Sequence, residues 1–314
     1  MFISYFHMIN VLDSIQYIMD IKKAHKEIGF IGLGIMGKPM ADNLVKAGFN
    51  VSFYARRKLI IEDMIAKGSK FLPSVSDVSK SCKIIFLNLP ESKDVKNVVL
   101  GRNGLYKGLQ KNTIIIDMST ICPNVTQELS NTLLKKNCYL IDAPVSGGEI
   151  GAIKGTLSIM VGGDRQKFLK IKSLLNTLGK DITYIGKSGS GQIAKACNQI
   201  LVAGTMSAVS EILILADKLK CDKTLIKKAL MGGFAKSKIL EVHGERMIKN
   251  NYKPGFTSKL HLKDMIIARN LARKVGLKLM GANRSLQLLK QVKKSKLSNK
   301  DSSIIHKMII KKSK

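Results

Sequence analysis

EIGFIGLGIMGKPMADNLVKAGFNVSFYARR, residues 27–57, is the stretch that decides the fold of this chain. A short apolar run at 28–31 leads directly into GLGIMG at 32–37, which is G-x-G-x-x-G. Apolar residues at helical spacing follow as far as Gly48, and a second apolar run covers 51–54. An isolated G-x-G-x-x-G is as often an ordinary turn, but the order strand, glycine-rich turn, helix, strand predicts a βαβ unit that binds a dinucleotide.

The three glycines of this turn have separate expected roles. Gly32 makes the tight turn, Gly34 lets the backbone approach the pyrophosphate, and Gly37 lets the helix and the strand pack closely. The helix N-terminus supplies backbone N–H groups and the positive end of its dipole to the phosphates. The predicted dinucleotide-binding loop is therefore Gly32, Leu33, Gly34, Ile35, Met36 and Gly37.

The end of the second strand bears on the choice of cofactor. An acidic residue there would bind the ribose hydroxyls of NAD, but the chain has Ala55-Arg56-Arg57 and no acid before Glu62. Arg56 is expected to clasp a 2′-phosphate or to stack on the adenine; an ordinary surface arginine is the plainer alternative. The expected cofactor is NADPH or NADH, with Arg56 favouring NADPH.

Further apolar runs alternate with helical patterns and predict the fold class. They cover 84–89, 114–117, 139–143, 157–161 and 182–185. The sequence therefore predicts an α/β fold with a Rossmann-type, doubly wound, mainly parallel sheet, followed by an all-helical C-terminal domain. Ligands bind beyond the carboxyl ends of such strands, so 88–90 and 119–120 are expected to line the cofactor site.

The expected domains follow from this pattern. Residues 27–188 form the NAD(P)-binding domain and 189–314 an all-helical domain for substrate binding and oligomerisation, while 1–26 form an N-terminal extension with no assigned role. Long apolar helices such as 200–215 exceed what one small bundle buries, which favours a homodimer or homotetramer.

The formal net charge of +31 is the usual footprint of a nucleic-acid or membrane binder. Only eight of the 53 basic residues are arginines, however, and the lysines are scattered along the chain. Because planar readers of phosphates and bases favour arginine, this distribution indicates a solvated lysine coat rather than a specific nucleic-acid site. Such a field would also steer small anionic substrates inward.

The cysteines and the apolar runs favour a cytoplasmic protein without a metal or a membrane span. Five dispersed cysteines form no CxxC pair, which suits a reducing compartment and no metal site. The longest apolar run, 200–216, is interrupted by Glu211, so no run is expected to cross a bilayer. Residues 1–26 resemble neither a signal peptide nor a mitochondrial leader.

Four later segments hold more glycine and polar residues than packing requires. They are 142–148, 189–199, 232–235 and 263–265. The first places the Ser146 hydroxyl and two flexible backbone amides after a strand, an arrangement suited to a carboxylate, although a plain Ser-Gly-Gly turn is the alternative.

Lys195 is the strongest candidate for chemistry in the second of these segments. It lies within the first two turns of a long apolar helix, and Asn198 and Gln199 are placed to share its face. Its neighbours Ala194 and Ala196 are small and apolar, and burial in such a setting makes an ammonium a useful acid near neutral pH. In so lysine-rich a chain the alternative is a solvated surface lysine.

These segments together resemble the β-hydroxyacid dehydrogenase family. The resemblance is carried by GFIGLGIMGKPMADNL (29–44), DAPVSGGEIGAIKGTLSIMVGGD (142–164), GQIAKACNQI (191–200) and MGGFAKSKILEVHGERM (231–247). It covers roughly 27–271, and the last two segments look most like the tartronate semialdehyde (2-hydroxy-3-oxopropionate) reductases of that family. Leu279-Met280-Gly281 departs from the family pattern, as does the lysine-rich stretch after it.

The resemblance implies residue roles beyond the glycine-rich loop. It implies that Lys195 is the catalytic acid/base and that Asn198 or Gln199 contacts the substrate. The other implied roles are substrate-carboxylate binding by Ser146, Gly147 and Gly148, nicotinamide contact by Leu89, Pro90 and Thr120, and closure on the cofactor by Lys263 with Asp264 in support.

The implied reaction is the reversible reduction of tartronate semialdehyde to D-glycerate by NAD(P)H, with Lys195 as the general acid. The alternatives are a 3-hydroxyisobutyrate dehydrogenase or a succinic semialdehyde/glyoxylate reductase of the same family. A rival from another class is a non-catalytic module, derived from the family, that uses its basic surface to bind nucleic acid or chromatin.

Overall fold

The chain is described by a computed structural model over residues 27–312, so the extension at 1–26 lies outside the described residues. It divides into two compact units, of which the first ends at Lys195 and the second begins at Ala196. This division lies inside one helix, α10 (Ser190–Lys218), rather than before it at 188. Lys195 therefore counts with the first unit.

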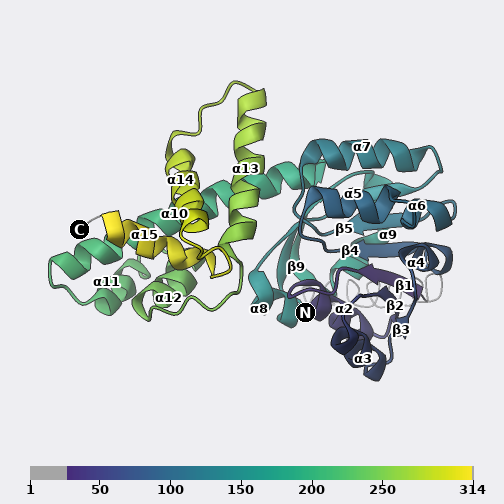
Figure 1. Cartoon of the computed structure of the whole chain (residues 1–314), viewed down its shortest axis with the longest axis horizontal. Helices are drawn as coiled ribbons and strands as arrows, with labels where there is room; N and C mark the ends of the chain where they lie inside the picture. The colour runs from purple at the N-terminus through teal and green to yellow at the C-terminus, as the bar shows by residue number, and fades with distance from the viewer. Residues whose placement is uncertain (1–26, 313–314) are drawn as a thin grey trace, which may run out of the picture. The chain divides into compact units, whose positions relative to one another are not determined.

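The first unit contains a nine-stranded sheet among the described residues (Figure 1). Its order is β3-β2-β1-β4-β5-β6-β8-β7, with β9 paired to β8, and β1 to β6 run parallel. The strands are β1 (Glu27–Ile31), β2 (Asn50–Tyr54), β3 (Lys70–Phe71), β4 (Ile84–Leu87), β5 (Ile114–Asp117), β6 (Tyr139–Asp142), β7 (Val145–Ser146), β8 (Leu157–Gly162) and β9 (Gly179–Gly186). The predicted Rossmann-type, mainly parallel sheet is confirmed.

Helices cover both faces of this sheet. Phe30, Phe86 and Ile116 pack on one face against α2 and α3, while Ile31, Ile85 and Ile115 pack on the other against α4, α5 and α7. The side chains divide this way because successive residues of a strand point to opposite faces. The helices are α2 (Gly37–Lys46), α3 (Lys58–Ala66), α4 (Val75–Ser81), α5 (Ser92–Leu100), α6 (Leu105–Gly108), α7 (Pro123–Leu134), α8 (Gly148–Lys154) and α9 (Arg165–Leu175).

Two features of the sheet were not predicted. The strands β3 and β7 have two residues each, which is too short for any hydrophobic alternation to identify them. In addition, β8 runs antiparallel to β6 and β7, because β7 and the short helix α8 turn the chain back after β6.

The second unit is helical over the described residues 196–312, as predicted. Its core includes Met206 and Leu213 of α10, Met265 of α13, and Leu286 and Leu289 of α14. Besides α10, the elements are α11 (Lys223–Leu230), the π-helical η1 (Leu240–Gly244), α12 (Glu245–Ile248), α13 (Ser258–Lys274), α14 (Met280–Lys294), the 3-10 η2 (Ser302–Ile304) and α15 (Ile305–Lys312).

The helix α10 is the one described helix long and apolar enough to cross a membrane by length and composition. The expectation that no run reaches that length was therefore wrong, because one carboxylate, Glu211, interrupts the sequence but not the helix. Its buried polar side chains, among them Gln192, Gln199 and Ser210, indicate a core helix, since buried polar groups need partners that lipid does not offer.

A buried histidine, His306, is expected to make the second unit sensitive to acid. The His306 ring lies 2.8 Å from the Ser210 hydroxyl, and burial lowers its pKa from 6.5 to about 4, with Lys223 lowering it further and Asp217 opposing. Between these two pH values the folded state binds fewer protons than the unfolded state. The corresponding stability is present above pH 6.5 and is lost as the pH falls toward 4, by about 3 kcal/mol.

We therefore expect the His306→Gln variant to lose less folding stability than the unaltered protein when the pH falls from 7 to 4.5. Urea unfolding at pH 7 and pH 4.5 should show a smaller drop in midpoint for the variant than for the unaltered protein. Lys307→Gln, a change at the next and exposed position, is the control and should keep the full drop. An equal drop in His306→Gln would show that other groups cause the acid sensitivity.

Candidate active site

The glycine-rich loop forms a cradle open to a ligand at its centre. Gly32 has φ +99°, and a Cβ added there would lie 2.2 Å from the Asn88 carbonyl oxygen. A Cβ on Gly37 would lie 2.0 Å from the Gly32 carbonyl oxygen, whereas one on Gly34 would meet nothing within 4 Å. The backbone is thus tight at both ends and accessible at Gly34, which fits a bound dinucleotide.

This cradle lies at the point where the strand order reverses. The strands β1 and β4 are neighbours. After β1 the chain continues to β2 on one side of this pair, and after β4 it continues to β5 on the other side. The loop after β4 is hydrogen-bonded to the ends of both neighbouring strands. The backbone N–H of Asn88 donates to the Ile31 carbonyl at the end of β1, and the Asn88 side chain donates to the Met118 carbonyl just after β5. Ligands of open α/β sheets bind at such a switch point, so Leu89 and Pro90 are placed at the expected edge.

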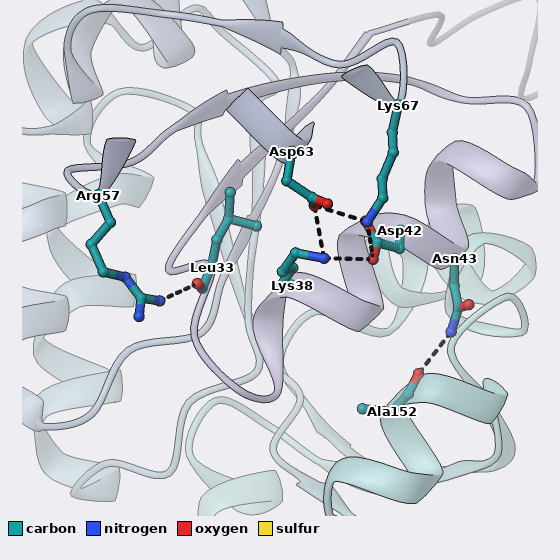
Figure 2. A network of polar contacts seen from close by, with 8 residues as sticks. All are labelled: Leu33, Lys38, Asp42, Asn43, Arg57, Asp63, Lys67 and Ala152. Atoms are coloured by element: carbon teal, nitrogen blue, oxygen red, sulfur yellow. Dashed lines mark hydrogen bonds and ion pairs between the residues drawn. The ribbon is translucent and has the colours of Figure 1, made fainter. Parts of the chain in front are cut away.

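Of the two arginines after β2, Arg57 reaches the glycine-rich loop (Figure 2). Arg57 donates from its guanidinium to the Leu33 carbonyl of the cradle at 2.9 Å. Arg56, the residue singled out from the sequence, is exposed. Arg57 was missed because the sequence does not tell which of two adjacent arginines turns toward the glycines.

A four-membered ion network joins α2 to α3 beside the cradle (Figure 2). Lys38 and Lys67 each contact the carboxylates of both Asp42 and Asp63, at 2.8 to 3.2 Å. Hydrogen bonds from the two lysines lower the pKa of Asp63. Lys38 follows the last glycine of the loop, but its ammonium is engaged with these acids, so its position there is structural.

The loop predicted to bind a carboxylate is built from two residues with left-handed backbone. Gly147 has φ +136° and Gly148 has φ +62°, conformations that favour glycine, and α8 begins at Gly148. The Asn43 side chain of α2 donates to the Ala152 carbonyl of α8 at 2.7 Å (Figure 2). This hydrogen bond therefore connects α2, which begins at the glycine-rich loop, to α8, which begins two residues after Ser146.

The helix that carries Lys195 is fixed at its start by a buried acid. The Asp142 carboxylate accepts hydrogen bonds from the backbone N–H groups of Gly189 and Gln192, at 2.9 and 3.0 Å. Burial raises the pKa of Asp142, and these hydrogen bonds oppose the rise. Lys195 itself is only 7% exposed, so it is not the solvated lysine of the alternative interpretation.

Gln192 links the same helix to the loop after β5. Its side-chain oxygen accepts from the Ile121 N–H at 3.0 Å, and its amide nitrogen donates to the Ser119 carbonyl at 2.8 Å. Ser119 in turn accepts from the Leu89 N–H through its hydroxyl, at 2.8 Å. These contacts could not be predicted from the sequence, in which Gln192 is only a glutamine near a helix start.

In the second unit, the remaining predicted residues form a chain of polar contacts. Asn198 donates to the Gln199 side chain at 2.8 Å, and Gln199 donates to the Asp264 carboxylate at 2.7 Å. The Lys263 ammonium lies 3.2 Å from Asp264. Gln199 is buried and donates to Asp264, while Asn198 is half-buried.

Comparison with known proteins identifies the family of this site. Residues 27–186 match the NAD binding domain of 6-phosphogluconate dehydrogenase, and residues 189–309 match the NAD-binding domain of NADP-dependent 3-hydroxyisobutyrate dehydrogenase. The chain is 45% identical to 2-hydroxy-3-oxopropionate reductase of Escherichia coli, over 81% of this chain and 86% of that protein. The chain belongs to the β-hydroxyacid dehydrogenase family.

Other relatives agree with this assignment. This β-hydroxyacid dehydrogenase is 35% identical to a probable mitochondrial 3-hydroxyisobutyrate dehydrogenase-like protein of Arabidopsis thaliana, over 87% of this chain and 82% of the relative. The solved 3-hydroxyisobutyrate dehydrogenase of Mycobacterium tuberculosis, with L-serine, has a TM-score of 0.82 and 25% identity, and the match covers 91% of this chain and 99% of that one.

The chain is thus an NAD(P)-dependent oxidoreductase acting on CH–OH groups. The family resemblance noted from the sequence is confirmed, and the rival interpretation as a non-catalytic basic module gains no support from these relatives. The residues 27–312 hold no group of three or more His, Cys, Asp or Glu side chains that could bind a metal ion.

Proposed function

We propose that this β-hydroxyacid dehydrogenase reduces tartronate semialdehyde to D-glycerate, reversibly, with Lys195 as the general acid. Bound NAD(P)H supplies the hydride to the aldehyde carbon. Lys195 donates a proton to the aldehyde oxygen, and its charge stabilises the negative charge that develops there. The observation that carries the proposal is the burial of Lys195 on a helix whose start is hydrogen-bonded to Asp142 and to the loop after β5.

The other residues are proposed to bind and orient. Ser146 and the backbone amides of Gly147 and Gly148 hold the substrate carboxylate, and Asn198 orients the substrate. The two left-handed glycines support this role, because their backbone is compatible with amides that converge on an anion. Lys263 is proposed to bind the cofactor, and Asp264 to orient its ammonium through their 3.2 Å contact.

The choice of substrate rests on the 45% identity to the Escherichia coli 2-hydroxy-3-oxopropionate reductase. The relatives that are named 3-hydroxyisobutyrate dehydrogenases support a second candidate, a 3-hydroxyisobutyrate dehydrogenase. The deciding experiment assays the purified protein with tartronate semialdehyde, methylmalonate semialdehyde, succinic semialdehyde and glyoxylate, each with NADPH and NADH, by absorbance of the reduced nucleotide. A higher kcat/KM for any other aldehyde acid would reject tartronate semialdehyde.

We further propose that NADPH is preferred and that Arg56 binds its 2′-phosphate. Arg56→Ala is then expected to raise the KM for NADPH about 10-fold, because charge-assisted hydrogen bonds of this kind contribute roughly 1.5–3 kcal/mol. The KM for NADH should stay unchanged. Arg57→Ala is the comparison: since Arg57 holds the Leu33 carbonyl, its loss should raise the KM for both nucleotides. Equal effects of Arg56→Ala on both would contradict the assignment.

A homodimer or homotetramer in the cytoplasm is proposed as well. Support comes from exposed apolar side chains on one helix, α10, including Ile193, Leu201 and Leu215. Sedimentation at micromolar concentration tests this proposal, and a monomer at all concentrations would reject it.

A further inference from the structure

Gln192 spans the peptide groups on either side of Thr120. Its side-chain oxygen accepts from the Ile121 N–H and its amide donates to the Ser119 carbonyl, so a single side chain pairs with both flanking backbone groups. Gln192 is 1% exposed, so water does not replace either contact. The two hydrogen bonds together fix the position of Thr120 relative to α10.

The same residue lies three positions before Lys195 on α10. Its backbone N–H donates to the buried Asp142 carboxylate, which also accepts from Gly189. The first turn of α10 is thus held both by the end of β6 and by the loop after β5. Because a helix is stiff over one turn, the position of Lys195 is set by these contacts.

The chain of contacts continues to the loop after β4. The Ser119 hydroxyl accepts from the Leu89 N–H, and the Ser119 N–H donates to Asp117. Leu89 and Thr120 are residues for which the family resemblance implies nicotinamide contact. Gln192 is the member of this chain that belongs to the lysine helix.

We infer that Gln192 is a positioning residue that holds Thr120 and Lys195 in register, so that the nicotinamide side of the site and the proton donor keep one relative geometry. The inference rests on the proposed role of Lys195. Errors of about 1 Å in such geometry cost up to about 100-fold in rate. Gln192 therefore acts on kcat through other residues and not through contact with the substrate.

The first test is Gln192→Met, which keeps the size of the side chain and removes both hydrogen bonds. We expect kcat to fall roughly 10- to 100-fold. The Kd for NADPH, measured by fluorescence titration, should change less than about 3-fold, since the glycine-rich cradle is untouched. Gln127→Met is the matched control, because Gln127 is an exposed glutamine that donates to the Ser188 carbonyl just before α10. It should keep the unaltered kcat.

The second test, Gln192→Glu, has a readout that a space-filling role would not move. A protonated carboxyl both accepts from Ile121 and donates to Ser119, whereas a carboxylate cannot donate. Since burial raises the pKa of a carboxyl, kcat of this variant should recover as the pH falls, relative to the unaltered protein. Amide hydrogen exchange of Ile121 should be slow in the unaltered protein and faster in Gln192→Met.

The outcomes separate this inference from the proposed function. If Lys195→Met retains activity, the role of Lys195 fails and the inference fails with it. If Lys195 is essential but Gln192→Met has unaltered kcat, only the inference is rejected. Unchanged Ile121 exchange, or no recovery of Gln192→Glu in acid at temperatures where it is fully folded, also rejects it.

Discussion

Replacement of Lys195 by methionine is expected to lower kcat by at least about 100-fold, the usual contribution of a positioned general acid. Methionine is close in length to lysine and suits a buried position, so the helix should remain folded. It carries no proton and no charge, so both the proton transfer and the stabilisation of developing negative charge are lost. Steady-state assays with saturating aldehyde and nucleotide measure the effect.

Nucleotide affinity separates loss of chemistry from loss of structure in this variant. The Kd for NADPH should stay within about 3-fold of the unaltered value, since the cradle residues are unchanged. Lys187→Met is the matched control, because Lys187 is an exposed lysine shortly before α10. A Lys195→Met protein that turns over at more than a tenth of the unaltered rate would remove Lys195 from the mechanism.

The parts of this site that the sequence predicted are those determined locally. The glycine-rich loop and the strands on either side of it follow from residues adjacent in the chain. The Ser146-Gly147-Gly148 turn follows for the same reason, since its glycines adopt left-handed backbone. In such segments the spacing of glycine and apolar residues determines the backbone conformation closely enough for the structure to be predicted from the sequence.

The contacts that fix Lys195 were beyond the sequence because they join distant segments. Asp142 is 50 residues from Gln192, and Gln192 is 73 residues from Ser119. Nothing in the composition around Gln192 tells which loop its amide will meet. The same applies to Arg57, whose guanidinium reaches Leu33 across 24 residues while its neighbour Arg56 does not. Such pairings depend on the assembled sheet.

The burial of Lys195 differs from what is expected of most lysines in this chain. With a net charge of +31, almost any lysine is expected at the surface. The apolar neighbours, the helix start and Asn198 set Lys195 apart in the sequence, and in the structure Lys195 is only 7% exposed. Its burial is costly for an ammonium unless polar groups surround it, which is itself an argument that the position serves the reaction.

Alanine at Gly34 and alanine at Gly37 are expected to fail in different ways. At Gly34 a Cβ meets nothing within 4 Å, so the fold should be unaffected and the melting temperature unchanged. The methyl group would occupy the surface that a pyrophosphate approaches, and the Kd for NADPH should rise at least about 10-fold. At Gly37 the Cβ would lie 2.0 Å from the Gly32 carbonyl oxygen, which is backbone and cannot rotate away.

For Gly37→Ala the start of α2 must therefore shift. We expect a loss of roughly 1–3 kcal/mol of folding stability, typical of overpacking, together with loss of nucleotide binding. Thermal melts and fluorescence titrations of both variants test the pair, with Gly281→Ala as the control, because a Cβ at that exposed position also meets nothing within 4 Å. Unaltered NADPH affinity in Gly34→Ala would mean that the phosphates do not approach the backbone there, and the cradle would then have to bind the dinucleotide by another route.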